Sequence, residues 1–185
     1  MSSAFAKKHI LVGVTGSIAA YKACDLVSRL VEMQAHTTVV MTRSAMRFVR
    51  PLSFESLTGE PVITSLWKRT KEYRRTVHIS LAQSIDCALI APASANIIAK
   101  LRIGICDDAL SCIMCACKKP VIIAPAMNDQ MYTNPATQEN IEILKGRGVT
   151  FIDPAEGRLA CGTTGKGRLA DVDCILQTLI SVLSR

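Results

Sequence analysis

The chain has 185 residues, of which 49% are apolar, 20% are charged and 4% are aromatic. This is the size of one ordinary domain, and so apolar a chain can bury a large core without disulfides or a structural metal. The formal net charge is +7, but a nucleic-acid surface needs basic and aromatic residues spread over several elements, and aromatic residues are scarce. Much of the excess lies in Trp67–Arg75, which we interpret as a solvated basic loop or, alternatively, as a run that attracts a phosphorylated small molecule. We expect a single domain over residues 1–185 that does not bind nucleic acid.

Nothing in the sequence points to export or to a membrane. Met1–His9 contains no apolar segment of the kind found in signal peptides, and the apolar stretches are interrupted well short of the roughly 20 residues that cross a bilayer. Six of the eight cysteines lie in apolar segments, where a reduced thiol behaves as a small hydrophobic side chain: Cys24, Cys87, Cys112, Cys115, Cys117 and Cys174. We therefore expect a cytoplasmic protein with no membrane partner.

Apolar runs and helical periodicity alternate along the chain. The predicted strands are, in chain order, His9–Val14, Thr37–Met41, Cys87–Ala91, Pro120–Ala124 and Val149–Ile152. The predicted helices are Ile18–Met33, Ala45–Val49, Ile79–Ile85, Ala95–Leu101, Asp107–Cys117, Pro135–Lys145 and Asp171–Leu183. Between the second and third helices, Pro51, Gly59 and Pro61 favour a loop-rich stretch. Because nearly every strand is apolar throughout, we expect an α/β fold: a single doubly wound parallel sheet, flavodoxin-like or Rossmann-like, with helices on both faces.

In such folds ligands bind beyond the carboxyl ends of the strands. Here the strand ends are Gly13–Ser17, Met41–Ser44, Ala91–Asn96 and Ala124–Asn128, all rich in small or hydroxyl-bearing residues. We expect these loops to form one crevice.

The first loop has the features of a mononucleotide phosphate site. Gly16 lets the backbone approach a ligand, and the N–H groups that open the next helix can hold a phosphate. The loop is not a Walker A motif, and it lacks the third glycine of the dinucleotide fingerprint. The alternative is a tight turn between strand and helix.

The next two loops carry polar side chains with two possible roles. Ser94 and Asn96 could cap the following helix or hydrogen-bond a planar ring system at the sheet edge. Asn128 directly follows a strand end and is suited to hold a carboxylate, whereas the nearby methionines are typical of packing.

The segment Glu156–Arg168 contains four glycines and Cys161. So glycine-rich a loop is expected to be mobile and could close over a substrate. Cys161 lies in a polar, basic setting that favours thiolate chemistry, the alternative being an incidental loop cysteine. The cysteines of Cys112–Cys117 do not have the spacing of a closed metal site, and we expect no metal.

The three histidines differ in their predicted surroundings. His9 begins a strand and His36 ends a helix, which indicates structural roles for both. His78 follows the basic run and precedes a helix, and taken alone it would attract no functional interpretation.

Six segments in this order resemble the homo-oligomeric flavin-containing cysteine decarboxylases, over nearly the whole chain. They are Gly13–Ala20 (GVTGSIAA), His78–Leu81 (HISL), Pro92–Asn96 (PASAN), Gly104–Asp108 (GICDD), Pro125–Met131 (PAMNDQM) and Leu159–Gly162 (LACG). Each is a weak signal alone, but the ordered set is specific.

The resemblance implies FMN as cofactor, a phosphorylated small-molecule substrate, and roles for particular residues. It implies that the FMN phosphate is held by Gly16, Ser17 and Ile18, and the rest of FMN by Ser44, Ser94, Ala95, Asn96, Ile97 and Ala126. It implies His78 as the catalytic histidine and Cys161 as the proton donor. It implies that Asn128 binds the substrate carboxylate, with further substrate contacts from Met131, Arg158, Leu159 and Ala160.

The implied reaction is the decarboxylation of 4'-phosphopantothenoylcysteine to 4'-phosphopantetheine in coenzyme A biosynthesis. FMN oxidises the cysteinyl thiol to a thioaldehyde, the resulting β-thioketo acid loses CO2, and FMNH2 reduces the enethiolate while Cys161 supplies a proton. The flavin is needed because the carbanion left by CO2 loss otherwise has no electron sink.

The resemblance also implies an assembly and leaves alternatives. A homotrimer, which can pack further into a dodecamer, would bring the histidine of one chain to the flavin of its neighbour. Ile97 and Tyr132 stand where the family usually has Thr and Trp, and the ligase domain fused to many bacterial relatives is expected to be a separate protein. The alternatives are a peptidyl-cysteine decarboxylase of lantibiotic maturation, a prenylated-flavin-forming transferase and a non-catalytic flavoprotein regulator. The sequence argues against the transferase, because such enzymes lack the Pro125–Asn128 segment and the lid.

Overall fold

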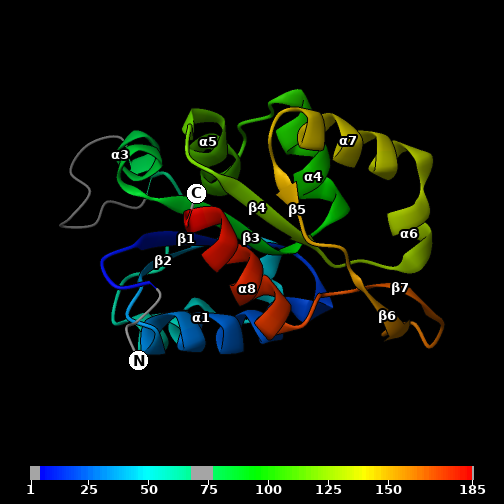
Figure 1. Cartoon of the computed structure of the whole chain (residues 1–185), viewed down its shortest axis with the longest axis horizontal. Helices are drawn as coiled ribbons and strands as arrows, with labels where there is room; N and C mark the ends of the chain where they lie inside the picture. The colour runs from blue at the N-terminus through cyan, green and yellow to red at the C-terminus, as the bar shows by residue number, and fades with distance from the viewer. Residues whose placement is uncertain (1–4, 68–76, 185) are drawn as a thin grey trace.

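The computed structural model describes residues 5–67 and 77–184, so residues 68–75 of the basic run lie outside the described part of the chain. Five parallel strands form the central sheet in the order β2-β1-β3-β4-β5 (Figure 1). They are β1 (His9–Val14), β2 (His36–Met41), β3 (Cys87–Ala93), β4 (Val121–Pro125) and β5 (Thr150–Phe151). The predicted doubly wound parallel sheet is confirmed, and its strand order is the flavodoxin-like one.

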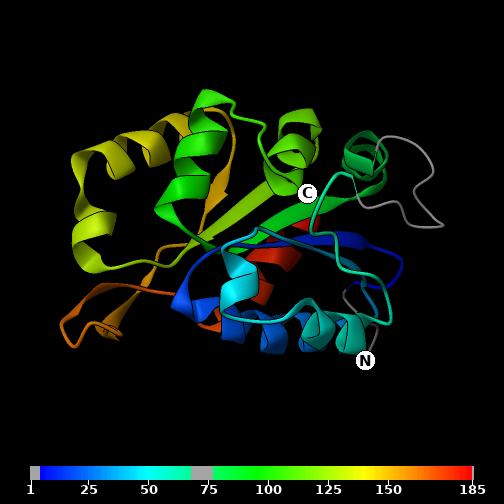
Figure 2. The same ribbon diagram turned by 180° about the vertical axis from the view of Figure 1, so that it is seen from behind.

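Helices cover both faces of the sheet, as Figures 1 and 2 show. On one face lie α1 (Lys22–Glu32), α2 (Pro51–Thr58) and α8 (Val172–Leu183). On the other lie α3 (Val77–Ser84), α4 (Ala95–Ile103), α5 (Ala109–Ala116) and α7 (Pro135–Gly146). The shorter elements are the 3-10 turns η1 (Ile18–Tyr21) and η2 (Ala45–Arg47), helix α6 (Asp129–Thr133), and the strands β6 (Ala155–Arg158) and β7 (Thr164–Arg168).

The uniform apolarity of the strands follows from this two-sided cover. In β1, Ile10 and Val12 pack with α1 and α8, whereas the intervening Leu11 packs with the helices of the opposite face. All three side chains are fully buried. Burial of one such side chain contributes about 1.5–3 kcal/mol, so neither face of the strand can carry a polar residue cheaply.

Three local predictions are wrong. The stretch after Arg50 is not loop-rich but forms α2, because Pro51 occupies its first turn and Gly59 ends it with φ +71°, the positions at which a helix favours these residues. His36 does not end a helix but begins β2. The glycine-rich segment is not an irregular loop, since β6 and β7 pair as an antiparallel ribbon.

The cysteines are less uniformly buried than the sequence predicts. Cys87 is fully buried in β3, but Cys115 and Cys174 are exposed. Within residues 5–67 and 77–184, no three or more His, Cys, Asp or Glu side chains are grouped so that they could hold a metal ion. None of the helices in this described part combines the length and apolarity needed to cross a bilayer.

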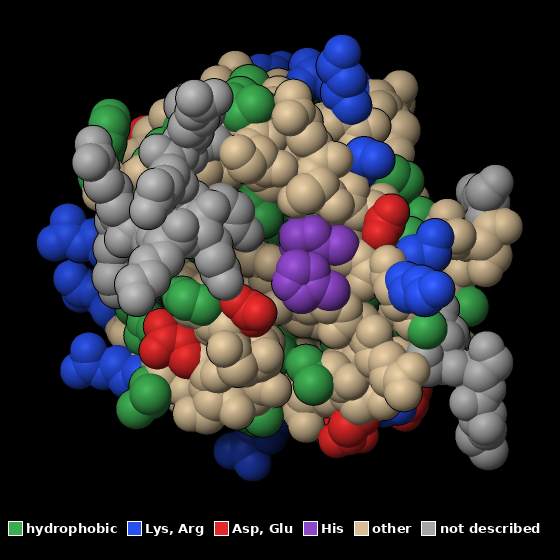
Figure 3. Space-filling view, turned by 90° about the vertical axis from the view of Figure 1, so that its left-hand side faces the viewer, with side chains coloured by type: hydrophobic (Ala, Val, Ile, Leu, Met, Phe, Trp, Pro, Cys, Tyr) green, Lys and Arg blue, Asp and Glu red, His purple; other side chains and the backbone are tan. Residues whose placement is uncertain are grey.

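Two histidines meet where β1 and β2 begin, on the side of the molecule that Figure 3 shows. The rings of His9 and His36 stack with centroids 4.0 Å apart, and His9 Nε2 lies 2.8 Å from Thr38 Oγ1. The pKa of His9 is lowered, mainly by burial and secondarily by the charge of the neighbouring His36. A hydrogen bond with the Ser84 backbone and the charge of Asp86 act in the opposite direction but are smaller. The folded state therefore disfavours protonation of His9.

This arrangement predicts a pH-dependent stability. Because the pKa of His9 is lower in the folded chain than its ordinary value of 6.5, the unfolded chain binds more protons near that pH. The contribution of the neutral His9 ring to the free energy of unfolding is complete above pH 6.5 and is lost as the pH falls towards the folded-state pKa. We expect the free energy of unfolding, measured in urea between pH 5 and 8, to decrease below about pH 6.5.

The same titration in His9→Gln should show a shallower decrease, because one titrating group is removed. The difference between the two slopes should correspond to less than one proton taken up on unfolding. In the matched variant His36→Gln, desolvation of His9 persists, so part of the decrease should remain. An unchanged slope in His9→Gln would show that other groups cause the pH dependence.

Candidate functional site

A cavity of about 680 Å³ lies beyond the carboxyl ends of β1, β3 and β4. The strand order reverses between β1 and β3, which is where doubly wound sheets bind ligands. The walls come from the loops that follow these three strands and from the β6–β7 ribbon. The expected crevice therefore exists, with the glycine-rich segment as its outer wall.

A buried hydroxyl joins two of the loops. The Thr15 side chain donates a hydrogen bond to the Pro92 carbonyl at 2.7 Å and accepts one from the Ser94 N–H at 2.9 Å. Thr15 is 1% exposed, so neither bond competes with water. The loop after β1 is thereby fixed to the loop after β3. Sequence reasoning did not single out Thr15.

Three helix-capping side chains surround the cavity. Ser17 accepts from Ala19 N–H at the start of η1, and Ser94 accepts from Ile97 N–H at the start of α4. Asn128 caps α6. Ser94 therefore has the first of the two roles considered for it, because it caps its helix, and it also lines the cavity. The partial positive charge of helix N-termini makes this edge of the sheet favourable for an anion.

The loop after β1 leaves backbone donors open. Within the described residues, the N–H groups of Gly16 and Ile18 make no hydrogen bond, whereas that of Ser17 is bound to Thr15 O. A Cβ on Gly16 would lie 2.5 Å from Cβ of Ser44, so only glycine lets the loop after β2 pack here. Lys22 also lines the cavity. This set of donors suits one phosphate group.

Asn128 is held in one orientation. Its Oδ1 accepts from the Gln130 N–H at 2.9 Å, as the helix cap requires, and its Nδ2 donates to Cys161 Sγ at 3.3 Å. The cap therefore turns the amide nitrogen towards the cavity mouth, where Cys161 lies. Two residues that are 33 positions apart in sequence meet in this way.

The glycines of the ribbon permit its close docking. A Cβ on Gly167 would lie 2.2 Å from the Met127 carbonyl oxygen, and one on Gly165 would lie 2.8 Å from Cβ of Asp129. The Met127 N–H also donates to the Gly167 carbonyl at 3.0 Å. On the far side of the ribbon, Lys166 lies over the ring of Tyr132, 5.7 Å from its centroid, so the tyrosine has an aromatic packing role here.

Cys161 differs chemically from the core thiol Cys87. Hydrogen bonding lowers the pKa of Cys161. The largest effect comes from the Thr163 side chain, followed by the Thr163 backbone and then the Asn128 amide. Burial raises the pKa of Cys87 to about 12. Cys161 is exposed at the cavity wall and more acidic than an ordinary thiol, which is the setting of a reactive cysteine.

The structure brings most of the predicted site residues together. Those that line the cavity are Gly16, Ser17, Ile18, Ser94, Ala126, Asn128, Met131, Arg158, Leu159, Ala160 and Cys161. Ser44 is not a lining residue, but it packs against Gly16 from outside the cavity. Ala95, Asn96, Ile97 and His78 are not among the lining residues, and Ile97 is 1% exposed within the core. Lining residues that sequence reasoning missed are Ala19, Tyr21, Lys22, Phe48, Met127, Gly167, Arg168 and Leu169.

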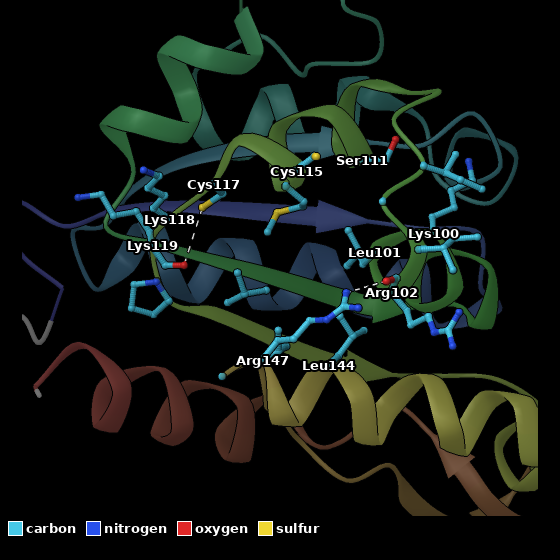
Figure 4. A pocket seen from close by; sticks show the side chains of 18 residues that line it. Lys100, Leu101, Arg102, Ser111, Cys115, Cys117, Lys118, Lys119, Leu144 and Arg147 are labelled. Atoms are coloured by element: carbon cyan, nitrogen blue, oxygen red, sulfur yellow. Dashed lines mark hydrogen bonds between the residues drawn. The ribbon is translucent and has the colours of Figure 1, made fainter.

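A second cavity, of about 730 Å³, lies at the opposite edge of the sheet, where α4, α5 and α7 end (Figure 4). Its basic side chains are engaged or turned outward. Arg147 donates to the Arg102 carbonyl at 2.6 Å, and Lys100 pairs with Asp107 at 2.6 Å. Lys118–Lys119 extend away from the centre in Figure 4. This cavity contains no arrangement comparable to Asn128 and Cys161.

The Thr15 bridge predicts a specific stability defect. Thr15→Val keeps the shape of the side chain but leaves the Ser94 N–H without its buried partner, while the Pro92 carbonyl keeps only the bond from the Thr15 N–H at 3.3 Å. We expect the free energy of unfolding in urea to fall by about 1–3 kcal/mol. Thr15→Ser retains the hydroxyl and should lose much less. A loss in Thr15→Ser with none in Thr15→Val would mean that the methyl group, rather than the hydroxyl, is what matters.

The docking of the ribbon predicts a second defect. In Gly167→Ala the new methyl group meets the Met127 carbonyl, so we expect a loss of about 1–3 kcal/mol in unfolding free energy or release of the ribbon. Limited trypsin digestion should then cleave faster after Arg158. Gly146→Ala is the control, because nothing lies within 4 Å of its Cβ position at the end of α7. Cleavage at an unchanged rate with unchanged stability would contradict tight docking.

Comparisons with known proteins agree with the geometry. A family model described as Flavoprotein matches residues 2–184. The coenzyme A biosynthesis bifunctional protein CoaBC of Bacillus subtilis is 46% identical over 172 residues, covering 92% of this chain and 42% of that protein. CoaBC of Haemophilus influenzae is 43% identical over 178 residues, covering 96% and 44%. The chain thus spans less than half the length of these relatives.

Solved structures superpose over nearly the whole chain. A cysteine-to-serine mutant of PPC decarboxylase complexed with pantothenoylaminoethenethiol has a TM-score of 0.87 and 34% identity, covering 97% of this chain and 100% of that one. The FMN binding protein AtHal3 has a TM-score of 0.81 and 36% identity, with coverages of 94% and 95%. The FMN-dependent cysteine decarboxylase SpaF has a TM-score of 0.84 and 28% identity, with coverages of 97% and 99%. The chain belongs to the Flavoprotein family.

Proposed function

We propose that this chain binds FMN and decarboxylates 4'-phosphopantothenoylcysteine to 4'-phosphopantetheine, a step of coenzyme A biosynthesis in the cytoplasm. The observation that carries the proposal is the hydrogen bond from Asn128 Nδ2 to Cys161 Sγ, 3.3 Å long, in the wall of the cavity at the carboxyl ends of the strands. The relatives named for coenzyme A biosynthesis and the PPC decarboxylase structure support it.

The residues of the cavity fit FMN. The open N–H groups of Gly16 and Ile18, with Lys22 nearby, provide for one phosphate group rather than for the pyrophosphate of a dinucleotide. The remaining walls combine small side chains such as Ala126 with apolar ones such as Leu169, which suits a flat aromatic ring. The FMN-binding proteins among the structural relatives support the same cofactor.

When bound, FMN accepts two electrons from the substrate cysteine and returns them after CO2 has left, which supplies the electron sink. Asn128 would hold the substrate carboxylate through the Nδ2 donor that the α6 cap directs into the cavity mouth. A neutral amide suits this role, because an arginine would stabilise the ionised carboxylate in the ground state and so oppose its departure as CO2. Arg158 in the ribbon would contact the substrate.

Cys161 would supply the proton of the reductive half. Its lowered pKa makes the thiol a better acid at neutral pH than an ordinary cysteine. A peptidyl-cysteine decarboxylase completes only the oxidative half, so a cysteine held in this way favours the full redox-neutral cycle. A non-catalytic regulator has no need of an acidic thiol next to a carboxylate-binding amide.

The site would be completed by a second copy of the chain. His78 lies in α3 and is not among the residues that line the cavity. Beside the cavity mouth, apolar side chains are strongly exposed: Ile18 56%, Tyr21 61% and Phe48 50%. A homotrimer, which can assemble further into a dodecamer, would cover this patch and bring His78 of one chain to the FMN of the next.

The experiment on the proposed function starts from the purified chain. Acid release and chromatography should recover one FMN per chain, and incubation with 4'-phosphopantothenoylcysteine should release CO2 and form 4'-phosphopantetheine. In Cys161→Ser, CO2 release should persist while an oxidised product accumulates and the flavin stays reduced without oxygen. Recovery of FAD or of no flavin, or 4'-phosphopantetheine formation at the parental rate in Cys161→Ser, would be incompatible with these roles.

Mixing experiments test the shared site. We expect His78→Asn to retain the trimer and FMN but to lose decarboxylation. Mixed with Asn128→Ala chains, it should regain part of the activity, since some interfaces then combine an intact His78 with an intact Asn128. A mixture of Cys161→Ser with Asn128→Ala is the control and should not regain full turnover, because these two side chains come from one chain. An active monomer in sedimentation would refute the shared site.

A further inference from the structure

Cys161 lies at the tip of the β6–β7 ribbon, between hydrogen-bonding side chains from two different elements. Thr163 Oγ1 is 3.1 Å from its sulfur, and Asn128 Nδ2 is 3.3 Å from it. The backbone fixes Thr163 relative to the thiol, because Leu159 N–H donates to the Thr163 carbonyl at 2.8 Å and Gly162 N–H donates to the Leu159 carbonyl at 3.0 Å. The turn therefore holds the hydroxyl beside the sulfur.

The two neighbours of the sulfur differ in what they can do. Asn128 presents its nitrogen, since its oxygen is taken by the α6 cap, and an amide nitrogen can only donate. Thr163 presents a hydroxyl, which accepts from a thiol and donates to a thiolate. Both side chains can donate to the sulfur before and after a proton leaves it, but of the two only Thr163 can also accept from the S–H and so orient the thiol proton.

We propose that Thr163 is a positioning residue that aims the Cys161 thiol and stabilises the thiolate formed when Cys161 gives up its proton. The proposal rests on the proposed role of Cys161 as proton donor. In that step the S–H bond breaks and a C–H bond forms at the substrate carbon that has lost CO2. This protonation leaves a thioaldehyde; bound reduced flavin would supply the hydride that converts it to the product thiolate, and solvent water would reprotonate Cys161.

The causes of the lowered pKa of Cys161 also favour Thr163. The hydrogen bond from the Thr163 side chain is the largest cause of the lowered pKa of Cys161, ahead of the Thr163 backbone and the Asn128 amide. Within the described residues, Cys161 is the partner in every hydrogen bond that the Thr163 side chain makes. Thr163 is exposed, so its hydroxyl has no role in the core.

The test measures the thiol directly on the full chain. Iodoacetamide labelling of Cys161 is followed against pH by mass spectrometry of the tryptic peptide Leu159–Lys166, which contains only this cysteine. In Thr163→Val and Thr163→Ala the midpoint of the labelling profile should move to higher pH, with labelling at pH 7 slowing about threefold for each half unit. Thr163→Ser should keep the parental midpoint. Thr164→Val, next to it in the ribbon, is the matched control and should also keep it.

Product analysis supplies the second readout. With 4'-phosphopantothenoylcysteine, Thr163→Val should release CO2 but form a larger share of oxidised product than Thr163→Ser, with a lower kcat for 4'-phosphopantetheine. A parental midpoint and a parental product ratio in both hydroxyl-free variants would overturn the proposal. If the parental chain forms no 4'-phosphopantetheine, the proposed function fails instead, and the labelling profile still decides whether Thr163 controls the thiol.

Discussion

The buried hydroxyl of Thr15 is the constraint on which the cavity depends. It donates to the carbonyl of Pro92, which also accepts from the Thr15 N–H at 3.3 Å, and it accepts from the N–H of Ser94, so one side chain bonds two buried backbone groups. Because Pro92 lies at the end of β3 and Ser94 directly follows it, whereas Thr15 follows β1, the bridge sets the distance between the turn after β1 and the next wall of the cavity.

The outer wall is set by backbone contact rather than by side-chain packing. Gly167 lies so close to the Met127 carbonyl that no side chain fits between them. The ribbon is therefore held against the loop after β4, and this contact places Cys161 beside Asn128. The glycines, which by composition alone indicate a mobile loop, here define a docked one. The chemistry of the thiol follows from the docking, since Asn128 and Thr163 lower its pKa only at hydrogen-bonding distance.

Sequence predicted the sheet and the crevice well, because apolar strands and the small polar residues after them depend on local composition. Prediction from sequence failed where one residue type is common in two kinds of local structure. Pro51 and Gly59 occur in loops but also begin and end helices, and only the packing of Phe54 in the core decides for α2. The side of α4 on which Ile97 lies, and the pairing of the ribbon, likewise depend on partners distant in sequence. His78 is not among the residues that line the cavity, and nothing in the sequence around it indicates a partner.

The two cavities illustrate why the smaller one is the site. Parallel strands with helical crossovers direct helix N-termini to one edge of the sheet and C-termini to the other, so the two edges carry partial charges of opposite sign. At the carboxyl edge, Ser17, Ser94 and Asn128 cap helix starts and leave an environment that attracts anions. At the amino edge, Arg147 donates to a carbonyl at the end of α4, where a cation complements the negative end of the helix. The larger cavity thus has basic side chains at helix C-termini, whereas the smaller one combines Lys22, Arg158 and Arg168 with capped helix starts, which is the better setting for the phosphate and carboxylate of the proposed ligands.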